Sequence, residues 1–175
     1  MRVSLLGPLQ VDGSPGSSVL GAAKERSLLA ALALSPGAVV STDALIAALW
    51  GEDPPAAARK TLQTYVWNLR QALGTEVIVT EPPGYSLQIG PDDVDVGRFR
   101  ALVREGEAAM VAGDAATASA VLADAMALWR GDPFSGVAPH TGLAGEAVRL
   151  HEEHLSALET RVAADLARVA PEALR

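Results

Sequence analysis

The periodicity of apolar residues changes twice along the chain, and this order constrains the fold more than any single motif. Strand-like alternation comes first, with Val3 and Leu5 on one face and Leu9 and Val11 after a Gly-Pro break. Three helical segments follow, and then two strand-like runs around a turn. From Asp95 onward every apolar repeat is helical. This order predicts an α+β unit followed by an all-α unit.

Capping residues, proline and glycine indicate where the first three helices begin and end. The first is expected from Ala23 to Leu34, and the second begins at a cap cluster, Ser41–Asp43. In the third, Asp53 is the expected N-cap, with Pro54 at the first helical position. Gly74 would end this helix.

Two further strands and a turn are expected after the third helix. The strands are Val77–Thr80 and Tyr85–Ile89. Pro83 and Gly84 suit the central positions of a type II turn, because glycine accepts positive φ cheaply there. Another short strand is expected near the N-terminus, at Ser18–Leu20.

The turn-rich Gly90–Asp93 indicates a boundary between two domains, residues 1–91 and 95–175. In the second domain one helix would end near Gly113, another would be capped by Asp114, and a long helix would span about 143–169. Three small residues fall at tetratricopeptide offsets, where they let paired helices approach closely: Gly106, Ala118 and Ala125.

Composition excludes several protein classes. A hydrophobic content of 49% with 20% charged residues is typical of a folded chain. The absence of cysteine excludes disulfides and thiolate chemistry, and a cytoplasmic location is expected. No apolar run is as long as a membrane span, so no membrane partner is expected. The net charge of −7 is unusual for a nucleic-acid binder. Any DNA contact must therefore come from a local surface, since salt screens charges over roughly 10 Å.

The third helix carries the expected DNA contacts. Its leucines define the inward direction, so Lys60, Thr64, Trp67 and Gln71 would project outward. Residues 54–75 include no carboxylate, and the outward groups are those that contact phosphates and base edges. The alternative is an ordinary solvated face. The DNA-binding residues expected on this helix are Arg59, Lys60, Thr61, Thr64, Asn68 and Arg70.

The remaining expected contacts lie on the hairpin and the first helix. Sheet, three helices and a hairpin form the winged-helix plan, in which the hairpin lies on the DNA backbone. Thr80, Gly84 and Tyr85 would then form the wing. Lys24 and Arg26, at the start of the first helix, could contact phosphate. The alternatives are a plain sheet hairpin and two solvent-exposed cations.

Five segments together resemble the Streptomyces antibiotic regulatory protein family: LLGPLQV, AAKERSLLAALAL, VVSTDALIAALWGEDPPAAARKTLQTYV, VTEPPGYSLQI and ALWRGDPF. The resemblance covers essentially the whole chain. It implies an OmpR-type winged helix-turn-helix followed by an all-α, tetratricopeptide-like bacterial transcriptional activator domain. It also implies a homodimer on double-stranded promoter DNA with direct repeats. Contact with RNA polymerase and activation of secondary-metabolite gene clusters are further implications.

Two features depart from the family. Members usually carry a Ser-Arg-Leu-Arg-Arg-like stretch where this chain has Trp67–Gln71, so two positive charges are missing. Each lost phosphate contact would reduce the salt dependence of log affinity by roughly 0.9. Trp67 could stack on deoxyribose, although we favour packing against the second domain or a neighbouring subunit. The family's activator domain continues beyond Arg175, so we expect a piece of a longer protein whose long helix exposes an apolar stripe.

Catalysis and metal binding find little support in the sequence. His151 and His154 are three residues apart, whereas the zinc-protease pattern needs four, so a solvated face is expected. A phosphate loop, a dinucleotide fingerprint and a serine elbow are all missing. We therefore expect no enzyme activity, no metal and no cofactor. The alternative to a DNA-binding regulator is a winged-helix protein-interaction module with weak or no DNA binding.

Overall fold

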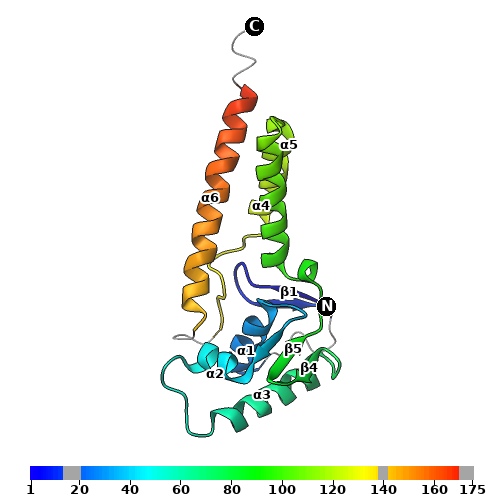
Figure 1. The fold of residues 1–175 in the computed structure, drawn as a ribbon, viewed down its shortest axis with the longest axis vertical. Helices are drawn as coiled ribbons and strands as arrows, with labels where there is room; N and C mark the ends of the chain where they lie inside the picture. Colours follow the sequence, from blue (N-terminus) through cyan, green and yellow to red (C-terminus); the bar gives the residue numbers. More distant parts are fainter. Residues whose placement is uncertain (14–20, 138–141, 170–175) are drawn as a thin grey trace.

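The structure, a computed structural model, describes residues 1–13, 21–137 and 142–169. Over these residues the molecule is elongated, with three helices and two small sheets in its lower part and three further helices rising above them (Figure 1). The expected strand at Ser18–Leu20 lies outside the described residues. The elements of the lower part are β1 (Arg2–Ser4), β2 (Gln10–Asp12), α1 (Ala23–Ala33), β3 (Val39–Ser41), α2 (Thr42–Trp50), α3 (Ala58–Leu73), β4 (Ile78–Glu81) and β5 (Gly84–Leu87).

The N-terminal strands and the first two helices confirm the predicted elements. Strands β1 and β2 pair antiparallel, with the buried Val3 opposite Val11. Ser41 caps α2, because its hydroxyl oxygen accepts a hydrogen bond from the backbone N–H of Ala44 at 3.1 Å. The buried leucines of α1, α2 and α3 meet in one core between the helices.

The predicted start of α3 is wrong. Ala57, not Asp53, is the residue that precedes the first helical turn, so the helix begins four residues beyond Pro54. The physical reason is Pro55, because a proline disfavours helical geometry in the residue before it. The other end is confirmed, since α3 stops at Gly74, which has a φ of +113°.

The hairpin is confirmed, but the predicted role of Gly84 is wrong. Strands β3, β5 and β4 form an antiparallel sheet in that order, and the sequence did not indicate β3. Gly84 is the first residue of β5, opposite Ser41, and is not among the glycines with positive φ. A Cβ on Gly84 would lie 1.8 Å from the carbonyl oxygen of Val40. Close approach of two strands, and not a type II turn, is what requires glycine here.

The upper part confirms the predicted helical unit. After the 3-10 turn η2 (Pro91–Asp93) come α4 (Asp95–Val111), α5 (Ala115–Ala127) and α6 (Ala144–Val169). Gly106 of α4 packs so closely on α5 that a Cβ there would lie 2.5 Å from Leu122. All three small residues at tetratricopeptide offsets are buried, as the close pairing of α4 and α5 requires.

One continuous core joins the lower and upper parts. The buried carboxylate of Asp95, at the start of α4, accepts the backbone N–H groups of Leu5 and Leu6 at 2.7 and 3.0 Å. On the other side, the N–H groups of Arg130 and Phe134 donate to the carbonyls of Leu6 and Leu5. The loop after β1 is therefore bound by the first residue of α4 on one side and by the segment after α5 on the other. Residues 1–91 and 95–175 as separate domains remain a prediction.

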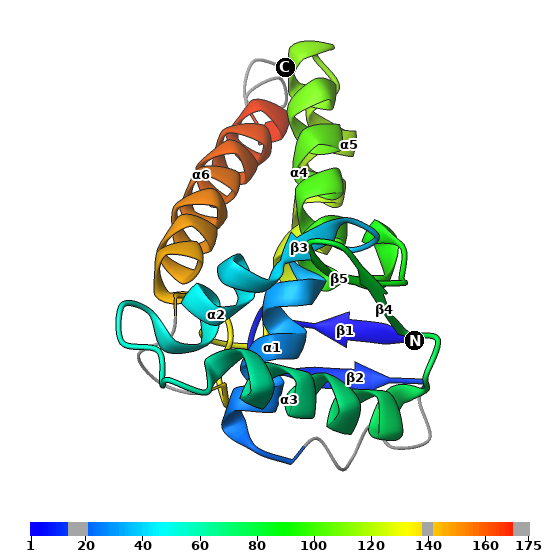
Figure 2. The ribbon, with the colours of Figure 1, turned by 60° about the horizontal axis from the view of Figure 1, so that its bottom comes forward.

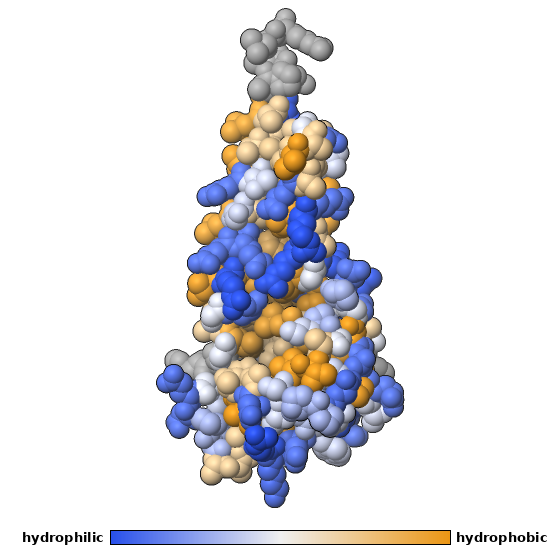
Figure 3. Space-filling model, viewed as in Figure 1, coloured by the Kyte–Doolittle hydropathy of each residue, from blue (hydrophilic) through white to orange (hydrophobic). Residues whose placement is uncertain are grey.

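Helix α6 exposes an apolar stripe, as expected. The exposed residues are Val148, Leu155, Leu158, Val162, Leu166 and Val169. Figure 3 shows apolar surface recurring along the edge of the molecule that α6 forms. Within the described ranges, no helix is both long and apolar enough to cross a membrane.

Candidate nucleic-acid interface

One face of α3 is open to solvent along its whole length. Lys60, Thr64, Trp67 and Gln71, here called the α3 stripe, are all exposed and recur at helical spacing. Seen from below, α3 lies across the front of the molecule with none of α4, α5 or α6 over it (Figure 2). The residues on the opposite side of the helix are buried: Ala58, Leu62, Val66, Leu69 and Leu73. The predicted outward direction of the helix is confirmed.

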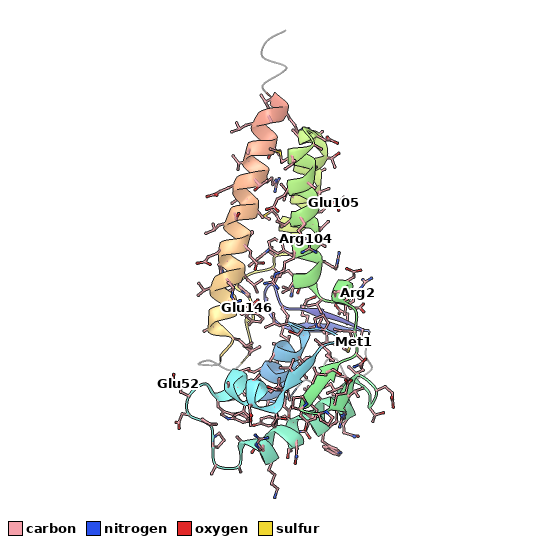
Figure 4. The ribbon with its side chains drawn as sticks, in the orientation of Figure 1. Met1, Arg2, Glu52, Arg104, Glu105 and Glu146 are labelled. Atoms are coloured by element: carbon pink, nitrogen blue, oxygen red, sulfur yellow. The ribbon has the colours of Figure 1, made fainter. Side chains whose placement is uncertain are left out.

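The exposed face of α3 carries a positive charge, although the chain as a whole is negative. Among the described residues Lys60 makes no ion pair, whereas Arg59 pairs with Asp43 of α2 at 2.5 Å. Both partners of that pair are well exposed, so it holds the guanidinium only weakly. The nearest preceding carboxylates, Glu52 and Asp53, lie in the loop before α3, and Glu52 projects to the side (Figure 4). The exposed surface of α3 itself carries no negative charge.

Thr61 and Asn68 lie at the edge of the stripe and are half-buried. The side-chain amide of Asn68 donates to the carboxylate oxygen Oε1 of Glu25 at 2.5 Å. The N-terminal turn of α1 passes beside α3 at this point. One of the two side-chain N–H groups of Asn68 is therefore already engaged within the molecule.

Arg70 links α3 to the hairpin. Its Nε donates to the carbonyl of Ile78 at 2.8 Å, and its Nη2 donates to the hydroxyl of Thr80 at 2.9 Å. The guanidinium is thus bound to β4, and Thr80 remains exposed beside it. Arg70 fixes the position of the hairpin relative to the α3 stripe.

The other two expected wing residues are inside the fold. Gly84 is buried where β5 crosses β3, and the side chain of Tyr85 is packed against the core with 9% of its surface exposed. The exposed part of the hairpin is its tip, Glu81–Pro83, together with Thr80. Gly84 and Tyr85 therefore hold the hairpin in place, and their predicted contact with DNA is untested.

Lys24 and Arg26 are both engaged within the molecule. The ammonium of Lys24 donates to the carbonyl of Leu49 and lies 5.8 Å from the ring centroid of Trp50. The guanidinium of Arg26 donates to the carbonyls of Gly21 and Gly136, each at 2.6 Å. These two cations therefore bind α1 to the end of α2 and to the neighbouring loops.

Two features of the face differ from expectation. Gln63, which is not among the expected contacts, is exposed next to Thr64, and its position on the helical wheel could have indicated this. The side chain of Trp67 is 60% exposed, and α3, which carries it, lies apart from α4, α5 and α6 (Figure 2). The expected packing of Trp67 against the second domain is therefore wrong within this chain.

The two histidines of α6 are not both solvated. The ring of His154 stacks on Trp129 with centroids 4.1 Å apart, whereas His151 is exposed. Burial, and to a lesser degree the nearby His151, lower the pKa of His154 below its ordinary value. No group of three or more possible metal ligands occurs in the part of the chain that the structure describes.

Comparison with known proteins identifies the family. Residues 16–87 match the family described as transcriptional regulatory protein, C terminal, and residues 94–173 match the bacterial transcriptional activator domain. The regulatory protein DnrI of Streptomyces peucetius is 38% identical over 177 residues, which cover 95% of this chain and 65% of DnrI. The chain belongs to the Streptomyces antibiotic regulatory protein family.

Other members of the Streptomyces antibiotic regulatory protein family agree with this assignment. The regulatory protein AfsR of Streptomyces coelicolor is 36% identical over 167 residues, which cover 95% of this chain and 17% of AfsR. The structure of Mycobacterium tuberculosis EmbR in complex with a low affinity phosphopeptide superimposes with a TM-score of 0.86 at 36% identity. That match covers 99% of this chain and 47% of EmbR. The winged-helix fold followed by a helical domain is thus that of a transcriptional regulator of this type.

Proposed function

We propose that this regulator binds double-stranded DNA by inserting α3 into the major groove. The observation that carries the proposal is the α3 stripe, which is exposed, free of carboxylates and borne by a helix whose other side is firmly packed. An α-helix fits the width of the major groove, and a helix fixed by its core presents the same side chains each time.

The side chains divide into base and backbone contacts. Lys60, Thr64 and Gln71 lie along the centre of the face and would reach base edges. Arg59 and Thr61 flank them and would contact phosphates, with the hairpin tip on the adjacent backbone as the wing. The proposal assigns structural roles to the other expected residues, which hold the helix and the hairpin: Lys24, Arg26, Asn68, Arg70, Gly84 and Tyr85.

The wider activity follows from the family. Two copies would bind as a homodimer to direct repeats near a promoter, and the helical part would contact RNA polymerase. Activation of a secondary-metabolite gene cluster is the resulting function. The support is the family membership together with the single α3 stripe, since one such helix per chain reads only a short site and a repeated site needs two chains.

A direct test measures how Lys60→Ala changes affinity for a duplex that the wild-type chain selects from a random-sequence pool. We expect about tenfold weaker binding, and a salt dependence reduced by roughly 0.9 if Lys60 contacts a phosphate. Arg104→Ala is the matched control, because Arg104 is also an exposed cation but lies on α4, far from α3 (Figure 4). The proposal is contradicted if both variants lose the same affinity for DNA, or if neither variant loses any.

A protein-interaction module is the second candidate function. The observation in its favour is charge, since the chain carries −7 while Arg70 is bound to β4 and Arg59 shares an exposed ion pair with Asp43. This candidate predicts that no duplex is enriched from the pool and that no salt-dependent affinity for DNA is measured. Enrichment of one motif by the wild-type chain would exclude it.

A further inference from the structure

We infer that Trp67 is a specificity-determining residue that recognises the methyl group of a thymine in the major groove. This inference rests on the proposed function, because it assigns a base to one residue of the proposed DNA-reading face. It goes beyond that function by naming the chemical group that Trp67 contacts.

The first step is the contrast between the three tryptophans. Trp50 stacks on Tyr65 with ring centroids 6.3 Å apart, and Trp129 stacks on His154. Both are partly buried, whereas Trp67 keeps 60% of its surface in solvent. Of the three tryptophans, Trp67 alone has a large apolar surface still available for a partner.

The second step is the position of Trp67 on the helix. It follows Thr64 by three residues and precedes Gln71 by four, so it lies within the α3 stripe and not on its flank. In a helix that enters the major groove, the central residues face base edges and the flanking ones face the backbone. This position favours a base edge over deoxyribose as the partner of the indole.

The third step is the chemistry of the groove. Base edges in the major groove present hydrogen-bond donors and acceptors, and the C5-methyl of thymine is their one apolar group. Burial of the indole against donors and acceptors would leave them without partners, which costs free energy. Burial against a methyl group removes apolar surface from water on both sides. The indole therefore favours thymine at the position it covers.

The experiment compares motifs that the wild-type chain and Trp67→Ala select from the same random-sequence duplex pool. The wild-type motif is expected to contain a thymine that the variant no longer requires, while the other positions persist. Each thymine of the wild-type duplex is then replaced by deoxyuridine, which lacks the methyl. One replacement should weaken wild-type binding about fourfold, equivalent to about 0.8 kcal/mol, and leave Trp67→Ala unaffected.

Leu155→Ala is the matched control. Leu155 lies on α6 and is 61% exposed, almost the same fraction as Trp67. It should select the wild-type motif and retain the deoxyuridine effect. Circular dichroism melts of all three chains check that the folds are intact, which is expected because both substituted side chains are largely in solvent.

The outcomes separate this inference from the proposed function. If the wild-type chain selects a motif, deoxyuridine can leave its binding unchanged, or can weaken binding as much for Trp67→Ala as for the wild type. Either result overturns the role of Trp67 and leaves the proposed function intact. Loss of cooperative binding to two repeats, with single-repeat affinity unchanged, also overturns it and assigns Trp67 to contact between copies. A wild-type chain that selects no motif overturns both.

Discussion

Gly84 shows how one residue determines the shape of the hairpin. Its missing side chain lets β5 lie against β3, where a Cβ would be 1.8 Å from the Val40 carbonyl oxygen. Gly84→Ala must therefore push the strands apart, and we expect the free energy of unfolding to fall by about 2–3 kcal/mol. Urea denaturation measures this. Gly145→Ala is the control, because its Cβ would enter open space, and a comparable loss there would contradict the argument.

His154 makes stability depend on pH. Because its folded-state pKa is lowered by burial, the folded state binds fewer protons than the unfolded state below about pH 6.5. The free energy of unfolding therefore falls as pH drops through this range. We expect thermal melts between pH 7.5 and 5.5 to show a falling Tm in the wild type. His154→Phe retains a ring against Trp129 but cannot titrate, so its Tm should fall less. Identical pH profiles would exclude His154 as the cause.

At the scale of elements, Arg70 joins the hairpin to α3. Arg70→Ala removes two hydrogen bonds to β4 and leaves the Ile78 carbonyl without its partner. We expect a stability loss of about 1–3 kcal/mol and faster amide hydrogen exchange in β4 and β5. Arg149→Ala is the control, since the side chain of Arg149 is 69% exposed and its ion pair with Glu146 lies on α6, away from the hairpin. Unchanged exchange in the hairpin of Arg70→Ala would show that the link is dispensable.

The element bounds that were predictable depend on local chemistry. Gly74 and Asp114 end and begin helices through their own conformation and side chain, so the sequence shows them directly. The start of α3 depended on a second proline, Pro55, whose effect outweighed a good N-cap. Strand β3 has three residues and pairs with β5, far along the chain, so its local pattern carries little signal.

Like the element bounds, the residues of the candidate site were predictable where they depend on the local sequence alone. Lys60 and Thr64 follow from helical periodicity, which needs only the sequence of α3. The hydrogen bonds of Asn68 to α1 and of Arg70 to β4 arise because other elements return beside α3. No periodicity within the helix contains that information.

At the scale of the whole molecule, Asp95 holds the winged-helix part to the helical part. Asp95→Ala leaves two buried N–H groups, those of Leu5 and Leu6, without an acceptor. We expect the free energy of unfolding to fall by about 3 kcal/mol, with faster amide exchange at both leucines. Asp95→Asn retains one acceptor oxygen and should lose less. A fully stable Asp95→Ala would mean that apolar packing and the backbone hydrogen bonds of Arg130 and Phe134 are enough to hold the two parts together.

The shared core also bears on regulation. Because β1, α4 and the segment after α5 bind one another, a ligand or partner that shifts α4 or α6 would act on the same body that carries α3. Rigid attachment would fix the direction in which the helical part projects from bound DNA. That direction would matter for the RNA polymerase contact proposed above.

The indole N–H signals of the three tryptophans test the central claim most directly. A nitrogen-15 spectrum of the whole chain, recorded while a selected duplex is added, reports on Trp50, Trp67 and Trp129 separately. The account predicts that the Trp67 signal moves together with the amides of Lys60 and Gln71, while the Trp129 signal stays in place. Movement of the Trp129 signal alone, with Trp67 unchanged at saturating duplex, would contradict it.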